Sequence, residues 1–139
     1  HETFYLTKKR DMKRKYSDQH KEMVVWVSVE QLKQLVTEIL ETIDKFEFKT
    51  KSQIVNACDS ISSNFVEGYY SGSTKEYRRF LRYARRSAAE LLDRVENVYQ
   101  RNRFNRDLFE RFEDRAIKTM YLIDRTIGGL EKKINSRNS

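Results

Sequence analysis

No proline occurs anywhere in the 139 residues of this chain, and glycine occurs only four times. Tight turns depend on these residues, so a β-sandwich or β-barrel, which needs many such turns, is excluded. A disordered chain rich in proline or glycine is excluded with it. Apolar residues make up 38% of the chain at regular spacing, which is enough to fold despite a charged fraction of 35%. The sequence therefore predicts an all-α protein.

Four segments carry apolar residues at steps of three and four positions, which places one apolar stripe on each of four helices. These predicted helices cover residues 29–45, 52–69, 73–101 and 106–134. In an alternative prediction, the first helix starts a turn or more earlier and includes residues 24–26. Short connections between amphipathic helices are typical of an up-and-down antiparallel four-helix bundle. We expect a basic flexible arm over 1–22, the bundle over 23–135 and a polar tail over 136–139.

Local signals mark the ends of these helices. Residues 28–31 and 73–76 each fit the capping box that begins a helix. A polar connector over 47–51 separates the first two helices, and the glycines at 68 and 72 predict the end of the second. The glycine pair at 128–129 lies inside the fourth helical pattern, where it is either tolerated or allows another backbone to approach.

The N-terminal segment has no clear periodicity, but it holds six basic residues and one acid over positions 8–15. Like charges this close repel one another in a packed element, so we expect a flexible or loosely helical arm. Its basic residues are candidates for binding nucleic acid, and the alternative is a solvated tail without a partner. They are Lys8, Lys9, Arg10, Lys13, Arg14 and Lys15.

Five arginines near the start of the third helix give the strongest functional signal. At about 100° per residue, they share an arc that is separate from the apolar stripe. Arginine offers paired donors that match phosphate, and tyrosines at 69, 70 and 83 offer stacking faces for bases. We call these residues the arginine stripe: Arg78, Arg79, Arg82, Arg85 and Arg86. The alternative is an interface with acids of a neighbouring subunit's first two helices, at Glu38, Glu41, Asp44 and Glu47.

The sequence carries no motif for catalysis. Only His1 and His20 occur, so no histidine pair is spaced to bind a metal and no catalytic triad is expected. Cys58 lies on an apolar face, where a buried structural thiol is favoured over a nucleophile. No glycine-rich phosphate or dinucleotide motif is present. We therefore expect no enzymatic activity, no metal and no other cofactor.

The longest apolar run covers only residues 23–27, far short of the ~20 residues that cross a bilayer. No signal peptide opens the chain, and one cysteine cannot form an internal disulfide. These observations favour a cytoplasmic protein without membrane contacts.

Residues 53–91 resemble a bacterial family of four-helix-bundle proteins named for 23S rRNA intervening sequences. The most specific matching positions are Asn64, Glu67, Gly68, Glu76, Phe80 and Leu81. The resemblance implies a small cytoplasmic bundle, often a homopentameric ring, with no known enzymatic activity. The accessory variability proteins of diversity-generating retroelements are similar bundles: basic pentamers that bind nucleic acid and partner a reverse transcriptase. An arginine pair frequent in the family is replaced by Val55 and Asn56, so no role of that pair is carried over.

These observations combine into one functional expectation. A formal net charge of +7 and the resemblance favour a non-enzymatic homo-oligomer, a pentamer, that binds RNA or other single-stranded nucleic acid. Binding would be mainly to phosphate and weakly sequence-specific, and a reverse transcriptase is a candidate partner. The alternative is a structural oligomer in which the arginine stripe forms the subunit interface. Glu67 is expected to pair with an arginine, across the bundle or at an interface.

Overall fold

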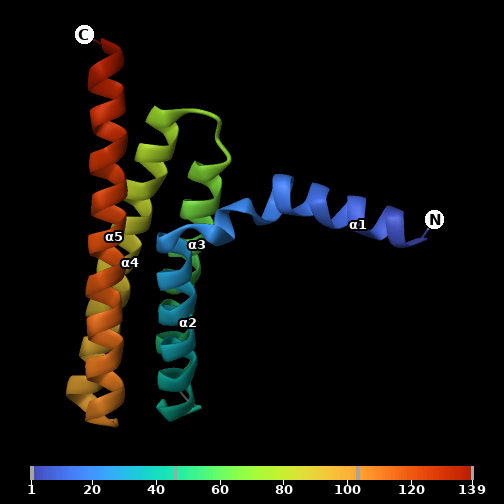
Figure 1. The fold of residues 1–139 in the computed structure, drawn as a ribbon. Coiled ribbons are helices and arrows are strands. Elements are labelled where there is room, and N and C mark those ends of the chain that lie inside the picture. Colours follow the sequence, from blue (N-terminus) through green and yellow to red (C-terminus); the bar gives the residue numbers. More distant parts are fainter. Residues whose placement is uncertain (1, 46, 103, 139) are drawn as a thin grey trace.

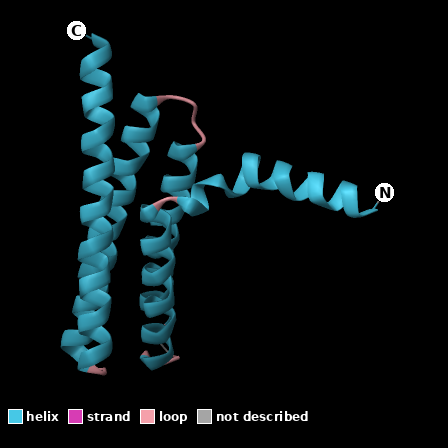
Figure 2. Ribbon diagram, in the orientation of Figure 1, coloured by secondary structure: helices cyan, strands magenta, loops and turns pink. Residues whose placement is uncertain are grey.

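The computed structural model describes residues 2–45, 47–102 and 104–138. Its five α-helices are connected by short turns, and the described residues contain no strand, which confirms the all-α prediction (Figures 1 and 2). The helices are α1 (Glu2–Lys13), α2 (Val24–Thr42), α3 (Phe48–Tyr69), α4 (Thr74–Asn102) and α5 (Arg106–Asn138). One helix more than expected is present, because the predicted arm contains α1.

Helices α2–α5 lie side by side in alternating directions, and we call them the body (Figure 1). Each helix contributes an apolar stripe to a shared core, since residues three and four apart lie on one face of a helix. Its largest fully buried side chains include Phe65, Phe112, Leu32, Ile39 and Ile61. In sequence order each helix of the body packs on the next, and α2 also packs on α5.

The arm, residues 2–22, consists of α1 and two linking turns. A π-helical turn (Arg14–Asp18) and a 3-10 turn (Gln19–Glu22) connect α1 to α2. Figure 1 shows α1 projecting sideways from the end of α2. The basic segment is therefore α-helical through Lys13.

The capping box at residues 28–31 does not begin the first helix, and the alternative, an extension over residues 24–26, is confirmed. Helix α2 begins at Val24, and Ser28 is a buried residue inside it rather than its N-cap. The Ser28 hydroxyl lies 2.7 Å from the Thr119 hydroxyl of α5, so it forms a contact between helices. The helix also ends earlier than expected, at Thr42. The connector predicted over 47–51 therefore lies earlier in the chain, between Thr42 and Phe48, where α3 begins.

Other end signals are confirmed. The backbone N–H of Glu76 donates to the Ser73 hydroxyl at 3.2 Å, which caps α4. Gly72 has a φ of +74°, a left-handed conformation that suits glycine after a helix. Gly68, however, lies within α3, where a Cβ atom would stand 2.8 Å from Cβ of Phe80. Its role is close packing between α3 and α4 rather than helix termination.

The C-terminal helix extends beyond its predicted end. Helix α5 continues through Asn138, so residues 136–138 of the predicted polar tail are helical, and Ser139 lies outside the described residues. A Cβ atom on Gly128 or Gly129 would meet no atom within 4 Å. Within the described chain, no second backbone approaches this glycine pair.

Candidate nucleic-acid interface

The first half of α4 and the second half of α5 are held together by polar contacts. Arg82 pairs with Glu131 at 2.7 Å, and Arg85 pairs with Asp124 at 3.1 Å. Further along, the guanidinium of Arg137 donates to the Thr74 hydroxyl at 3.3 Å. These contacts set the register of two antiparallel helices whose facing halves are both basic.

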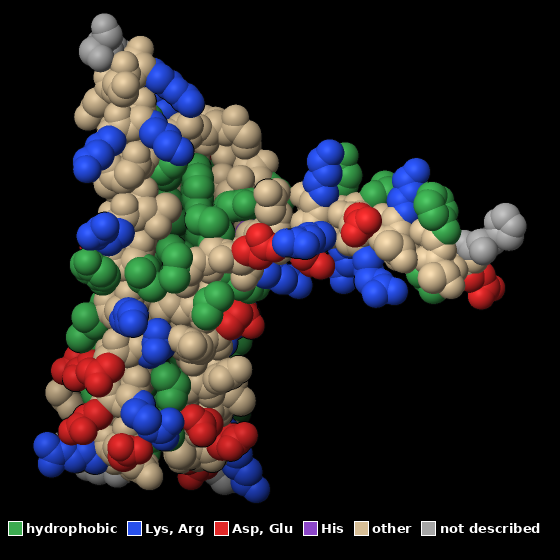
Figure 3. All heavy atoms as spheres, viewed as in Figure 1, with side chains coloured by type: hydrophobic (Ala, Val, Ile, Leu, Met, Phe, Trp, Pro, Cys, Tyr) green, Lys and Arg blue, Asp and Glu red, His purple; other side chains and the backbone are tan. Residues whose placement is uncertain are grey.

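Positive charge is concentrated on this pair of half-helices. Residues 74–89 and 117–138 together hold eleven Lys and Arg but only three Asp and Glu. These two segments therefore carry eight more positive than negative charges. The whole chain carries +7, so the rest of the chain is slightly acidic. Figure 3 shows blue side chains along upper α5, whereas red ones gather towards the lower end of the body. We call this surface the α4/α5 basic face.

The arginine stripe divides into three groups on this face. Arg82 and Arg85 are paired with the acids of α5. Arg79 pairs with Glu76 at 2.7 Å, and this hydrogen bond raises the pKa of the guanidinium above its ordinary value. The guanidiniums of Arg79 and Arg86 lie 5.7 and 5.6 Å from the ring centre of Tyr83. Arg78 forms no ion pair with any described residue.

Four basic residues of α5 that the sequence analysis did not select also belong to this face. They are Arg125, Lys132, Lys133 and Arg137. None of them forms an ion pair with a described residue. The seven-residue spacing of Arg125 and Lys132 was a usable signal, because residues seven apart lie on one side of a helix.

A shallow hollow of about 500 Å³ lies on α5 within this face, at the glycine pair. Its lining residues are Tyr121, Asp124, Arg125, Gly128, Gly129 and Lys132. Tyr121 is 56% exposed, and its hydroxyl accepts a hydrogen bond from Arg125 at 3.3 Å. The hollow thus combines an exposed aromatic ring with two cations, the groups that contact bases and phosphates in single-stranded nucleic acid.

The basic residues of the arm lie on a separate surface. Lys13 lies 3.9 Å from Asp18, and Arg14 pairs with Glu22 at 2.6 Å. The remaining four have no carboxylate partner among the described residues: Lys8, Lys9, Arg10 and Lys15. The structure therefore does not bring the arm and the arginine stripe into one continuous patch.

Two of the tyrosines expected to stack on bases have a structural role instead. Tyr69 and Tyr70 pack against His20, which is only 5% exposed and makes an edge-on contact with Trp26. The His20 backbone N–H donates to the Tyr70 hydroxyl at 3.3 Å, and Nδ1 lies 2.9 Å from the same oxygen. Burial lowers the pKa of His20 below its ordinary value. This cluster, which we call the aromatic anchor, fastens the arm to the body.

The structure confirms that Cys58 is buried, as expected for a structural thiol. Cys58 is a core residue, 4% exposed, and burial raises the pKa of its thiol to about 11, so it stays protonated near neutral pH. Within residues 2–45, 47–102 and 104–138, no group of three or more His, Cys, Asp and Glu is placed to hold a metal ion. None of the helices described is both long and apolar enough to span a bilayer.

The fold and the surface together define a small basic all-helical protein with its positive charge on one pair of half-helices. A family model described as 23S rRNA-intervening sequence protein matches residues 21–125, and the chain belongs to this family. The match begins at the end of the arm, so α1 lies outside it. Comparisons with curated proteins and with solved structures find no match.

Proposed function

We propose that this protein is a non-enzymatic, cytoplasmic nucleic-acid-binding protein that uses the α4/α5 basic face to bind RNA or other single-stranded nucleic acid. Contacts are mainly to phosphate, so recognition depends little on base sequence. The body serves as the up-and-down four-helix bundle of a homo-oligomer, and the family resemblance favours a pentamer. On the same resemblance, a reverse transcriptase is the candidate protein partner.

The observation that carries this proposal is the concentration of eleven basic side chains against three acids on facing halves of two helices. Within that surface, Glu131 and Asp124 are each paired with one arginine of α4. Arg82 and Arg85 therefore stabilise the helix pair, while Arg78, Arg125 and Lys132 remain for phosphate.

Oligomerisation strengthens this kind of binding. Each copy carries +7, so five copies carry roughly +35, which attracts a polyanion strongly at low ionic strength. Several basic faces in one particle also bind one long strand at once, which raises the effective affinity without new contacts.

The experiment is a binding titration of the full chain with labelled single-stranded RNA and DNA. The informative variant is Arg125→Gln with Lys132→Gln, because neither cation has a carboxylate partner among the described residues. Changing Arg82 and Arg85 to glutamate is less informative, because it places new negative charges beside Glu131 and Asp124 and disturbs the helix pair as well as the basic face. The matched control is Lys49→Gln with Lys51→Gln at the start of α3, which removes the same charge elsewhere.

We expect the Arg125/Lys132 variant to bind every sequence at least tenfold more weakly than wild type, and the control to bind like wild type. Equal weakening by both variants would assign binding to net charge alone. Absence of wild-type binding at about 50 mM salt would refute the proposal and favour the competing function, a structural oligomer without a nucleic-acid role.

A further inference from the structure

Helix α1 is a short helix without a partner. Every one of its residues is exposed, and its nearest neighbours are the linking turns that follow it. Isolated helices of about 12 residues are only marginally stable in water, because few hydrogen bonds offset the cost of nucleation. A helix of this length that carries large apolar side chains is stabilised when another surface covers them.

Three of the uncovered apolar side chains of α1 and its linking turn lie on one side. Tyr5, Met12 and Tyr16 are 65%, 53% and 66% exposed, and positions seven and four apart share a helix face. Lysines border them, and together these side chains line a groove of about 680 Å³. Figure 3 shows hydrophobic and basic side chains next to one another along the projecting arm. It is lined by Tyr5, Lys8, Lys9, Met12, Lys13 and Tyr16. The occupant must therefore offer both apolar surface and negative charge.

The arm does not fold back onto its own body to cover this groove. The Arg14 guanidinium donates twice to Oε1 of Glu22, at 2.6 and 3.1 Å, which braces the turn after α1. A few residues later the aromatic anchor buries His20 against Tyr70 and Trp26. These contacts hold α1 pointing away from the body, so its groove is left uncovered and open to solvent.

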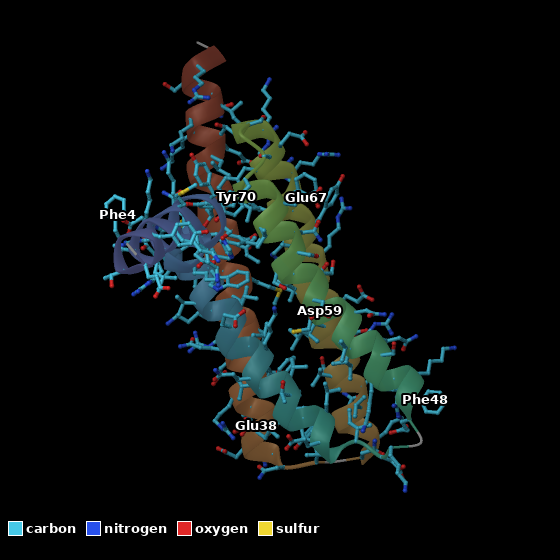
Figure 4. All side chains as sticks on the ribbon, turned by 90° about the vertical axis from the view of Figure 1, so that its right-hand side faces the viewer. Phe4, Glu38, Phe48, Asp59, Glu67 and Tyr70 are labelled. Atoms are coloured by element: carbon cyan, nitrogen blue, oxygen red, sulfur yellow. The ribbon has the colours of Figure 1, made fainter. Side chains whose placement is uncertain are left out.

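Helix α3 presents a surface with the complementary chemistry. Residues 52–69 contain no Lys or Arg, and Asp59 and Glu67 are both exposed there. Neither acid forms an ion pair with a described residue. The expected pairing of Glu67 with an arginine across the bundle is therefore wrong, and its pairing at an interface stays a prediction. Val55 on this helix is also exposed, at 37%. Figure 4 shows Asp59 and Glu67 along α3, well apart from Phe4 at the tip of α1.

The distance between the two acids on α3 is similar to the distance between two lysines of the arm. Asp59 and Glu67 are eight residues apart, a rise of about 12 Å along α3. Lys8 and Lys15 are seven residues apart, about 10.5 Å at the rise of an α-helix, with Lys15 just past α1 in the π-helical turn. Flexible lysine side chains span the small difference, so both pairs can form at once.

We propose that α1 of one copy, together with the π-helical turn that follows it, docks on the outer surface of α3 in a second copy, with Lys8 and Lys15 near Asp59 and Glu67. Met12 and the two tyrosines then cover Val55. The contact is head-to-tail, because it joins two different surfaces of one chain, and such contacts close into rings or continue as filaments. This assigns an interaction surface outside the proposed nucleic-acid face.

A second copy fits this groove better than the other occupants. Two α1 helices facing each other would bring their lysines together, which is repulsive. A nucleic acid would pair with the lysines but leave Met12, 53% exposed, in water. Only a surface that is both acidic and apolar uses the whole groove.

The test is the mass of the full chain in solution, by light scattering, for wild type and charge-reversal variants. We expect Lys8→Glu with Lys15→Glu, and separately Asp59→Lys with Glu67→Lys, to shift the mass towards the 16.8 kDa of one chain. The chain that combines all four reversals should regain the wild-type mass, since the pairs are restored with opposite sign. The matched control is Glu96→Lys with Asp114→Lys, two exposed acids on α4 and α5, which should leave the mass unchanged.

Disulfide cross-linking between two copies tests the contact between α1 and α3 even where association is too weak to change the mass. Copies carrying Met12→Cys and copies carrying Val55→Cys should cross-link on mixing and oxidation, while Met12→Cys with Asn97→Cys on α4 should not. The native Cys58 does not interfere because it is buried.

Three results would overturn the docking proposal. The first is a wild-type chain that stays monomeric and cysteine variants that form no cross-link, and the second is a reversal variant with wild-type mass. The third is an arm variant that keeps its mass but loses RNA binding, which would make nucleic acid the occupant of the groove. Loss of RNA binding in the Arg125/Lys132 variant, or its absence in wild type, bears only on the proposed function.

Discussion

Replacing Gly68 by alanine should destabilise the protein, although alanine is the better helix former. The added Cβ would stand 2.8 Å from Cβ of Phe80 and 3.2 Å from the Tyr77 backbone oxygen, distances that require α3 and α4 to move apart. Overpacking of this kind costs about 1–3 kcal/mol. Gly68 is the next-to-last residue of α3, so little helix propensity is regained there. We expect a net loss of about 1–2 kcal/mol of unfolding free energy.

Gly129→Ala is the matched control, because its Cβ would meet no atom within 4 Å in the interior of α5. There the gain in helix propensity, about 0.5–1 kcal/mol, is unopposed. Thermal and urea unfolding at one fixed protein concentration measure both variants, since oligomerisation makes stability depend on concentration. The two variants should shift the midpoint in opposite directions. A Gly68→Ala protein as stable as Gly129→Ala would refute the close-packing argument.

Three further predictions concern other buried groups. Folding lowers the pKa of His20 below 6.5, so the folded state favours the neutral imidazole. The contribution of His20 to the stability of the protein is fully present above pH 6.5 and is lost as the pH falls through the lowered pKa. The fluorescence of Trp26, the only tryptophan, should therefore change as the pH is lowered below 6.5 in wild type but not in His20→Gln. Ser28→Ala should cost about 1 kcal/mol in urea unfolding, because it removes the hydrogen bond to Thr119; no loss would contradict that role. Cys58 should react with a thiol reagent at pH 8 only as fast as the protein unfolds, and immediate reaction would contradict its burial.

The sequence predicted which segments are helical better than where they begin. Periodicity located α3, α4 and α5, and Ser73 correctly predicted the start of α4, because capping is local chemistry. Ser28 has the same local pattern, but its hydroxyl contacts Thr119, ninety-one residues away, and the helix starts earlier. Such a choice depends on tertiary packing, which spacing within one segment does not show.

The candidate site was predictable only in part, because the sequence shows patterns within one helix but not the packing of one helix against another. The arginine stripe is visible in the sequence because its members share one helix. That Arg82 and Arg85 pair with Glu131 and Asp124 depends on the antiparallel register of α4 against α5. The same register brings Arg125 and Lys132 of α5 into this face, and no analysis of α4 alone could add them.

The most direct test of the central claim is the salt dependence of nucleic-acid binding by the full chain. If phosphate contacts on the α4/α5 basic face drive binding, the logarithm of affinity should fall linearly with the logarithm of salt concentration. The Arg125→Gln/Lys132→Gln variant should lower the steepness of that line by roughly 1–2 units, while Lys49→Gln/Lys51→Gln should leave it unchanged. A wild-type affinity that does not change with salt, or an unchanged slope in the Arg125/Lys132 variant, would contradict the account.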